Sequence, residues 1–401
     1  MSIKLRSYFF LKNNTLWMLL FFAGTLQSCV EPFDFEQETF ESALVVEGRI
    51  TDNVQHHRIV LSRSFRFEEE KAAPEVNAQV IVQEEGQREY LFQEVEPGIY
   101  ESREEFSAKP GMEYQLLINT SSNEVYASEP TVLTPQSSIE NVTASKIINE
   151  EGVSGIVMQV DSGSIPGESP FLMYEYQEDF KMVSPMSALN DFDIVNDQIT
   201  LVLKEKEEYT CFGSDKSTDI NLVNTTLLGG NKVKGHVLNF IPKNDPRIAQ
   251  RYSLLVKQYV LSQSAYSYYN TLKDLSQAES LFSQIQPGLL QGNMYSVTQP
   301  DEPVIGFFSV ASVATKRIFF DFLDFYSLSE GGATFVTNCP ITRPDATTLK
   351  ALIRAGEVKF LEEANMQPPD EEGAGDYRVV PLYCMDCTVY GTNVVPDFWE
   401  E

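Results

Sequence analysis

Positively charged residues are scarce in this sequence. Its 401 residues include 30 Lys and Arg against 58 Asp and Glu, which gives a net charge of −28 at pH 7. Nucleic-acid affinity comes largely from Lys and Arg that neutralise phosphates, and attraction to anionic lipid comes from the same side chains. The composition therefore argues against a nucleic-acid partner and against a chain that lies flat on an anionic membrane.

Histidine is also rare, with three residues in the chain. His56 and His57 are neighbours at the start of an expected strand, so they would point to opposite faces and would not readily chelate one metal. We expect both at the surface or at an edge, and His236 on another strand. The sequence contains no HExxH, GxSxG or phosphate-binding glycine motif, so no catalytic residue, metal or cofactor is predicted.

Tryptophan is scarce as well, and this bears on hydrolases. Acidic residues are numerous enough to supply a paired-carboxylate glycosidase site, which needs two carboxyl groups in one cleft. Such a site normally also needs aromatic side chains that stack on sugar, and Trp399 is the only tryptophan after residue 29. We therefore predict a protein that is not an enzyme, with a polymer hydrolase as a less favoured alternative.

Apolar runs of membrane-spanning length are absent. The run at residues 16–26 has eleven residues, whereas a spanning helix needs about 20. Basic residues precede it, which is typical of a signal peptide. It ends in Leu26-Gln27-Ser28-Cys29, which resembles a bacterial lipobox and implies cleavage before Cys29 and acylation of its thiol. We therefore predict a removed signal peptide at residues 1–28 and a lipidated tether at residues 29–42 that holds the protein on a membrane.

Acidic residues follow the predicted anchor at once. Glu31, Asp34 and Glu36 resemble the surface-export signals of Bacteroidota lipoproteins. The resemblance implies a lipid-anchored protein of the outer membrane that faces the cell exterior. A strongly acidic, soluble ectodomain suits that environment.

Cysteine is sparse after the anchor, where Cys211, Cys339, Cys384 and Cys387 remain. An even number in an exported protein favours disulfides, and four cysteines allow three pairings that the sequence does not distinguish. Cys384 and Cys387 also form a CxxC, so zinc binding and redox chemistry stay open. The surrounding segment is predicted to be strand and turn, and a second matching pair for zinc is missing, so structural disulfides are favoured.

Short strands dominate what is present. Between residues 43 and 135, runs such as "ALVVEGRIT" and "MEYQLLIN" recur about every ten residues with turn residues between them, which predicts a β-sandwich. Tyr114, Leu116 and Ile118 alternate onto one face. The "GRITD" segment at 48–52, together with "PGMEYQL" at 110–116, resembles the Ig-like, transthyretin-like or carboxypeptidase-regulatory type of sandwich. That resemblance implies a fold and no chemistry.

The remaining residues, 136–401, predict a larger β-rich domain with helical insertions. A helical period runs through residues 262–286, with Ser262 or Ser264 as its N-cap. A second helix is expected after Cys339, with Asp345 as its cap. The acidic residues between 190 and 197 are interpreted as a solvated loop. The chain as a whole is therefore predicted to be mainly β.

Tyrosines gather around the first of these helices, namely Tyr252, Tyr259, Tyr266, Tyr268 and Tyr269. Tyrosine is enriched at binding surfaces because one end of its side chain is apolar and the other polar. A helix packed on a sheet buries the same residues in a core. Both interpretations stay open, and the last four tyrosines form a candidate binding face.

The whole chain resembles an uncharacterised family of Bacteroidota outer-membrane lipoproteins that is known only as a domain of unknown function. The matching segments are "LVVEG" at 44–48, "VKQY" at 256–259, "AYSYY" at 265–269, Gly292-Asn293, "GFF" at 306–308 and the closing "CMDCT". Members are often encoded beside TonB-dependent receptors. The resemblance therefore implies a non-enzymatic accessory partner of such a β-barrel receptor in substrate capture or gating, with an unknown ligand. A cell-surface scaffold or adhesion protein is the alternative.

Overall fold

The computed structural model describes residues 42–65, 72–85, 88–164, 170–226, 228, 232–277, 290, 292–364 and 375–401. The chain separates into two units, Met1–Ser42 and Ala43–Glu401. The predicted signal peptide, the lipidated Cys29 and all but the last residue of the tether lie outside the described residues. Within the described residues, no helix is both long and apolar enough to cross a membrane.

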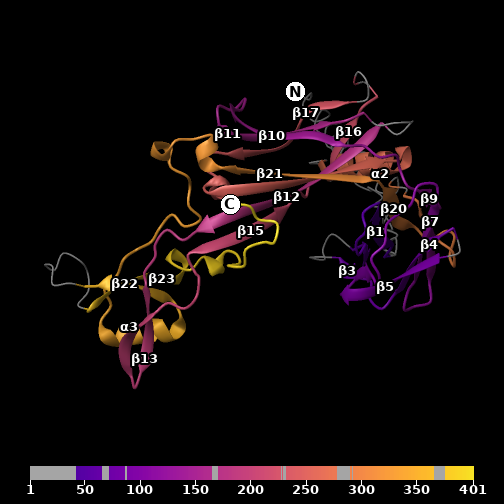
Figure 1. Ribbon diagram of the computed structural model, residues 1–401. Helices are drawn as coiled ribbons and strands as arrows, with labels where there is room; N and C mark the ends of the chain where they lie inside the picture. The colour runs from indigo at the N-terminus through magenta and orange to yellow at the C-terminus, as the bar shows by residue number, and fades with distance from the viewer. Residues whose placement is uncertain are drawn as a thin grey trace, which may run out of the picture. The chain divides into compact units, whose positions relative to one another are not determined.

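Strands dominate the described chain, so the prediction of a mainly β protein is confirmed (Figure 1). Eleven of the described strands form one large sheet: β1 (Leu44–Thr51), β2 (Arg58–Arg63), β3 (Ala73–Pro74), β4 (Gln79–Glu84), β5 (Arg88–Glu96), β6 (Ile99–Ser102), β7 (Glu113–Asn119), β8 (Val125–Ser128), β9 (Thr131–Val132), β19 (Met294–Ser296) and β20 (Val304–Ala311). Their order is β19-β8-β7-β4-β5-β6-β2-β1-β20, with β3 beside β2 and β9 beside β7. In β7 the side chains of Tyr114, Leu116 and Ile118 are buried, as their alternation predicted.

Two strands from late in the chain complete this sheet. β20 runs parallel to β1, with Leu44 opposite Val304 and Thr51 opposite Ala311, and β19 pairs with β8. The sequence analysis expected a strand at β20 but placed it in the second domain, beyond a boundary at residue 135. That placement follows from the general tendency of consecutive strands to pair with one another. The alternation within a strand predicts which of its faces is buried, but it does not predict the strand with which it pairs.

Asn293 and two glycines let the two ends of the sheet approach each other. The Asn293 side chain donates to the carbonyl oxygen of Phe308 and accepts from its N–H, each at 2.8 Å, so it replaces one rung of a strand ladder. A Cβ on Gly292 would lie 1.6 Å from the carbonyl oxygen of Gly306. A Cβ on Gly306, where φ is +139°, would lie 2.1 Å from the carbonyl oxygen of Val46. The Gly292-Asn293 and Gly306 segments therefore form the seam where the sheet nearly closes.

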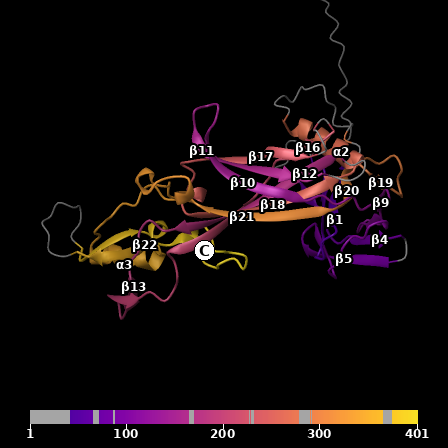
Figure 2. The same ribbon diagram turned by 45° about the horizontal axis from the view of Figure 1, so that its top comes forward.

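A sandwich of two further sheets follows (Figure 2). One sheet has the order β10-β11-β17 and consists of β10 (Ile139–Ile148), β11 (Ser154–Ser162) and β17 (Val233–Pro242). The other has the order β15-β12-β18-β21, with β16 beside β12, and consists of β12 (Phe171–Val183), β15 (Thr210–Lys216), β16 (Asn221–Asn224), β18 (Arg251–Leu261) and β21 (Val313–Asp321). Ile156 and Met158 of β11 share one buried core with Leu254 and Val256 of β18, so the two sheets pack face to face.

Both predicted helices are present. α2 (Gln263–Gln277) follows β18, and the Ser262 hydroxyl caps it by accepting from the Ala265 N–H at 3.2 Å. Residues 278–286 of the predicted helix lie outside the described residues. α3 (Ala346–Ala355) begins after Asp345, whose carboxylate accepts from two backbone N–H groups. Short 3₁₀ turns are η2 (Pro246–Ile248), η4 (Phe322–Asp324), η5 (Leu328–Glu330), η6 (Leu382–Cys384) and η7 (Cys387–Val389).

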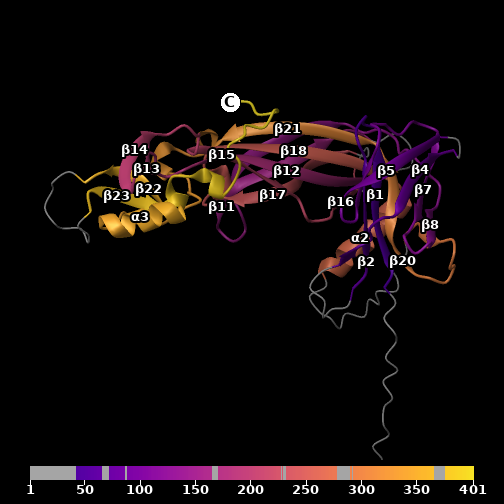
Figure 3. The same cartoon turned by 90° about the horizontal axis from the view of Figure 1, so that it is seen from below.

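Two hairpins and α3, which come from separate parts of the chain, lie together (Figure 3). β13 (Asn190–Val195) pairs with β14 (Gln198–Leu203), and β22 (Val358–Glu363) pairs with β23 (Tyr377–Pro381). α3 contacts β13 and β22.

The β13–β14 hairpin replaces the solvated acidic loop that the sequence analysis expected at 190–197. Asp191 and Asp193 alternate with apolar residues along β13. Asn196 and Asp197 both have positive φ, 52° and 61°, as a two-residue type I′ turn requires. The predicted loop is wrong because polar and apolar residues alternate along the segment with the period of a strand, despite its negative charge.

Candidate functional site

A pocket of about 520 Å³ lies where the eleven-stranded sheet, the five-stranded sheet and α2 meet. Its wall comes from β1, β2, β20, β12, α2 and the loop at residues 217–220. Small-ligand sites usually have this range of volume and a mainly apolar and aromatic wall with a few polar groups. The pocket is therefore the leading candidate for a binding site among the described residues.

Arg49 and Glu175 form an ion pair in this pocket. Arg49 Nη1 donates to Glu175 Oε1 at 2.8 Å, and the guanidinium carbon lies 4.1 Å from the centroid of the Tyr259 ring. The Tyr259 hydroxyl donates to the other carboxylate oxygen of Glu175 at 3.1 Å. Because Arg49 lies on β1 whereas Glu175 and Tyr259 lie on β12 and β18, the cluster joins two sheets.

Strand alternation explains how these side chains meet. In β1, Val46 and Ile50 are buried in the core of the first sheet, so Val45, Glu47 and Arg49 point to the opposite face, toward the pocket. In the second sheet, Met173 lies opposite Tyr259, two positions before Glu175 on the same face of β12. Side chains related in this diagonal way are within reach of each other.

The charges of this cluster are fixed near neutral pH. Burial raises the pKa of Glu175, but the charge and hydrogen bond of Arg49 and the hydrogen bond of Tyr259 outweigh it and hold the pKa below its usual value. Burial lowers the pKa of Arg49, and the opposing effect of Tyr269, Glu175 and Tyr259 leaves it above its usual value. Burial raises the pKa of Tyr259 to about 12. The site is therefore a closed ion pair beside a neutral phenol.

α2 brings two of the four candidate tyrosines into the pocket. Tyr268, which is 8% exposed, and the half-buried Tyr269 line it, and the Tyr268 ring centroid is 5.4 Å from that of Phe307. Tyr266 instead stacks on Phe171 with ring centroids 4.3 Å apart and does not line the pocket. The cluster thus divides between core packing and pocket wall, and its role in binding stays a prediction.

Arg49 and Glu175 are not among the site residues predicted from the sequence. Arg49 belongs to the "GRITD" segment, but the resemblance of that segment to a sandwich predicts only a fold and no binding residue. Glu175 was one acidic residue among 58 Asp and Glu. An Arg in the middle of an apolar strand, next to a glycine, was the one signal that could have marked the site, because a half-buried Arg needs a counter-charge.

The four cysteines pair as Cys211 with Cys387 and Cys339 with Cys384, with Cα–Cα distances of 5.7 and 5.8 Å. This pairing fits the prediction of structural disulfides and chooses one of the three connectivities. Each cysteine of the CxxC bonds a different, distant cysteine, so the motif does not act as a dithiol pair in this structure. The bridges attach the C-terminal segment to β15 and to the stretch after η5.

His57 corrects the expectation of a surface histidine. Its residue is 2% exposed, its Nε2 lies 2.9 Å from the carbonyl oxygen of Phe106, and its ring meets the Phe106 ring edge-on at 4.5 Å. The reason is the period of β2, since Ile59 continues the same buried face. His56 is exposed, and His236 lies on β17 with Nε2 2.7 Å from Asn221 Oδ1.

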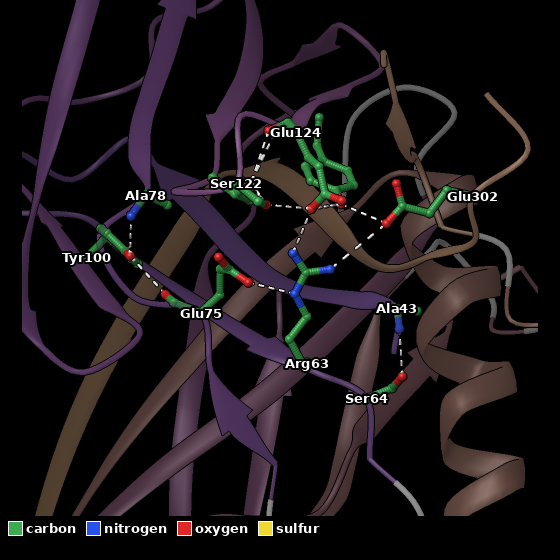
Figure 4. A network of polar contacts seen from close by, with 11 residues as sticks. Ala43, Arg63, Ser64, Glu75, Ala78, Tyr100, Ser122, Glu124 and Glu302 are labelled. Carbon is green, nitrogen blue, oxygen red and sulfur yellow. Dashed lines mark hydrogen bonds and ion pairs between the residues drawn. The ribbon is translucent and has the colours of Figure 1, made fainter. Parts of the chain in front are cut away.

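Three carboxylates surround Arg63 in the first sheet (Figure 4). Arg63 donates to Glu75 at 2.6 Å and to Glu124 at 3.1 Å, and it lies 3.9 Å from Glu302. The Tyr126 hydroxyl donates to Glu302 at 2.7 Å. Glu302 lies between β19 and β20, so this network fastens the late strands to the early ones. Across the described ranges, no group of three or more His, Cys, Asp or Glu is arranged to hold a metal ion.

Fold and pocket together define a β-rich protein of several sheets with a ligand-sized pocket at their junction. The chain belongs to the family described as "Domain of unknown function (DUF4249)", whose profile matches residues 30–317. The matched span includes all the residues that line the pocket and ends within β21. A comparison with curated proteins finds no match to this chain. The predicted family of unknown function is confirmed, whereas a Bacteroidota origin stays a prediction.

Proposed function

We propose that this protein is an outer-membrane lipoprotein, anchored through acylated Cys29 and facing the cell exterior. In this proposal it is a non-enzymatic partner of a TonB-dependent β-barrel receptor and assists substrate capture or gating.

The pocket is the observation that carries the proposal. Its volume of about 520 Å³ and its mixed wall suit the capture of a small ligand. The charged state of Glu175 favours binding over acid–base chemistry at this residue, because an efficient general base has a pKa near the working pH. The pKa of Glu175 is instead held below its usual value by Arg49 despite its burial.

The tether supports a partner close to the membrane. β1 begins at Leu44, so the strand that forms one wall of the pocket follows directly on the predicted tether. Residues 30–42, which follow the predicted anchor, reach at most about 45 Å when extended at roughly 3.3 to 3.6 Å per residue. A captured ligand would therefore be held within a short distance of an outer-membrane barrel.

Co-purification tests this proposal. We expect the detergent-solubilised, tagged chain to recover a β-barrel protein, and the Cys29→Ala variant to leave the membrane fraction and recover much less of it. A wild-type preparation that recovers no barrel protein contradicts the proposal. Binding of the released Cys29→Ala chain to matrix or neighbouring surface proteins, with no barrel present, would favour the scaffold or adhesion alternative instead.

A further inference from the structure

The Arg49–Glu175 pair has hydrogen-bonding capacity left over. Arg49 Nε is buried and has no hydrogen-bond partner in the part of the chain that is described. Glu175 keeps 41% of its side chain exposed and accepts one hydrogen bond at each oxygen, although a carboxylate has about four lone-pair sites. The pocket therefore offers open acceptor positions on Glu175, within an ion pair that has no net charge.

Two tyrosine hydroxyls add to this capacity. Tyr268 and Tyr269 both line the pocket, and neither hydroxyl forms a hydrogen bond with any residue in the described ranges. Each neutral phenol can donate and accept, and burial raises the pKa of Tyr268 to about 12. These hydroxyls also suit a ligand that both donates and accepts.

A charged ligand fits this arrangement poorly. Its charge would compete with an ion pair closed at 2.8 Å, and displacing one member would leave the other without its counter-charge, which is costly in a partly buried site. Beside the ion pair, the pocket wall contains Glu47, Asp219 and Arg58, so acidic groups exceed basic ones by one. The chain also carries a net charge of −28, so an anion gains no long-range attraction. A purely apolar ligand would cover the exposed part of the Glu175 carboxylate and replace none of its hydrogen bonds to water.

Another part of the wall is aromatic. The rings of Tyr268 and Tyr269 lie 5.4 Å apart with an interplanar angle of 80°, and Phe307 lies beside them. Val60 and Leu272 extend this apolar surface. Tryptophan is scarce in this sequence, but the pocket supplies aromatic side chains through tyrosine and phenylalanine.

We propose that this pocket binds a short neutral saccharide. Each saccharide hydroxyl donates and accepts at once, so it can donate to the exposed carboxylate of Glu175 and bond to the hydroxyls of Tyr268 and Tyr269 without breaking the Arg49–Glu175 ion pair. The C–H face of a sugar ring packs on the aromatic wall formed by Tyr268, Tyr269 and Phe307. This inference rests on the proposed function and names the ligand class for the same pocket.

Calorimetric titration of the detergent-solubilised full chain tests the ligand class. The probes are neutral oligosaccharides of α- and β-linked glucose, mannose, galactose and xylose, with trigalacturonate as the anionic probe and trialanine as the zwitterionic one. We expect saturable binding of at least one neutral probe, at least about tenfold tighter than either charged probe. The proposal is overturned if no neutral probe binds or if a charged probe binds more tightly.

Two tyrosines of α2 provide a matched pair of variants. Tyr269→Ala removes an aromatic wall and should weaken binding of the neutral probe at least about fivefold. Tyr266→Ala, on the same helix and also half buried but outside the pocket, should leave the affinity unchanged. Equal losses in the two variants would overturn the assignment of the site. Tyr269→Phe retains the ring and reports the hydroxyl alone, which keeps the test valid if Tyr269→Ala fails to fold.

The two proposals fail separately. Recovery of a barrel protein without saccharide binding removes the ligand class and leaves the partner. Saccharide binding without recovery of a barrel protein removes the partner and leaves the ligand class.

Discussion

At Gly306 the backbone of β20 lies against β1 with no room for a side chain. Its φ is +139°, and an added Cβ would lie 2.1 Å from the carbonyl oxygen of Val46. We expect Gly306→Ala to lower the free energy of unfolding by about 3 kcal/mol or more, since both the backbone conformation and the close approach oppose it. Denaturant titration measures this loss.

Gly111→Ala is the matched control for Gly306→Ala. Gly111 has a φ of +80°, but an added Cβ there has no atom within 4 Å. We expect it to cost only about 1 kcal/mol, from the backbone conformation alone. Similar losses at the two glycines would contradict the claim that β20 needs Gly306 for its approach to β1.

His57 makes a contribution to stability that depends on pH. Burial lowers its pKa below the usual 6.5, and the opposing contact with the Phe106 carbonyl only partly compensates. Between the folded pKa and the unfolded pKa, the unfolded chain therefore binds a proton at His57 that the folded chain does not. The contribution of neutral His57 to the free energy of unfolding is complete above about pH 6.5 and is lost as the pH falls through the folded pKa.

We expect His57→Asn to reduce the fall in the free energy of unfolding between about pH 7 and pH 5. The comparison concerns the difference between the two pH values, because the substitution also changes packing around Phe106. Denaturant titrations at both pH values measure it. A variant that loses as much stability as the wild type over this interval would show that His57 does not carry the effect.

At the scale of elements, the seam between β19 and β20 depends on one amide side chain. Asp at position 293 keeps the shape of Asn293 but cannot donate to the Phe308 carbonyl oxygen, and it places a carboxylate in a buried position. We expect Asn293→Asp to cost about 2–4 kcal/mol and to speed amide hydrogen exchange in both strands. Exchange measured by mass spectrometry localises the effect.

Asn393→Asp serves as the control for the seam variant. Asn393 also donates to a carbonyl oxygen, that of Glu207 at 2.8 Å, but it is exposed. We expect a cost below about 1 kcal/mol, as for most surface substitutions, with unchanged exchange in β19 and β20. If the amides of β19 and β20 exchange as slowly in Asn293→Asp as in the wild type, the proposed role of Asn293 in the seam is contradicted.

Local patterns predicted individual elements well and their partners poorly. The alternation at Tyr114, Leu116 and Ile118 predicted β7, and Asp345 predicted the start of α3. The pairing of β20 with β1 could not be predicted, because each strand shows only its own buried face. The ion pair between Arg49 and Glu175 spans 126 residues, so the pocket exists only once two sheets have packed.

At the scale of the whole molecule, two disulfides constrain distant parts of the chain. Cys211–Cys387 spans 176 residues and Cys339–Cys384 spans 45. Loop-closure entropy predicts that replacing either pair by serine lowers the free energy of unfolding by about 3–5 kcal/mol, with the larger loss for the longer loop. Denaturant titration of the two double variants under oxidising conditions measures both losses. A larger loss for the Cys339–Cys384 pair would contradict this account.

The late arrival of β20 has a consequence for how the protein is made. Leu44 pairs with Val304, about 260 residues later, so β1 is synthesised long before its parallel neighbour. Until then β1 exposes an open edge, and open edges recruit other chains, while pairing between distant segments is slow. A fragment that ends at residue 135 would keep such edges permanently. The nascent chain therefore needs protection from aggregation until residue 311 has emerged, whatever happens to the sheets in between.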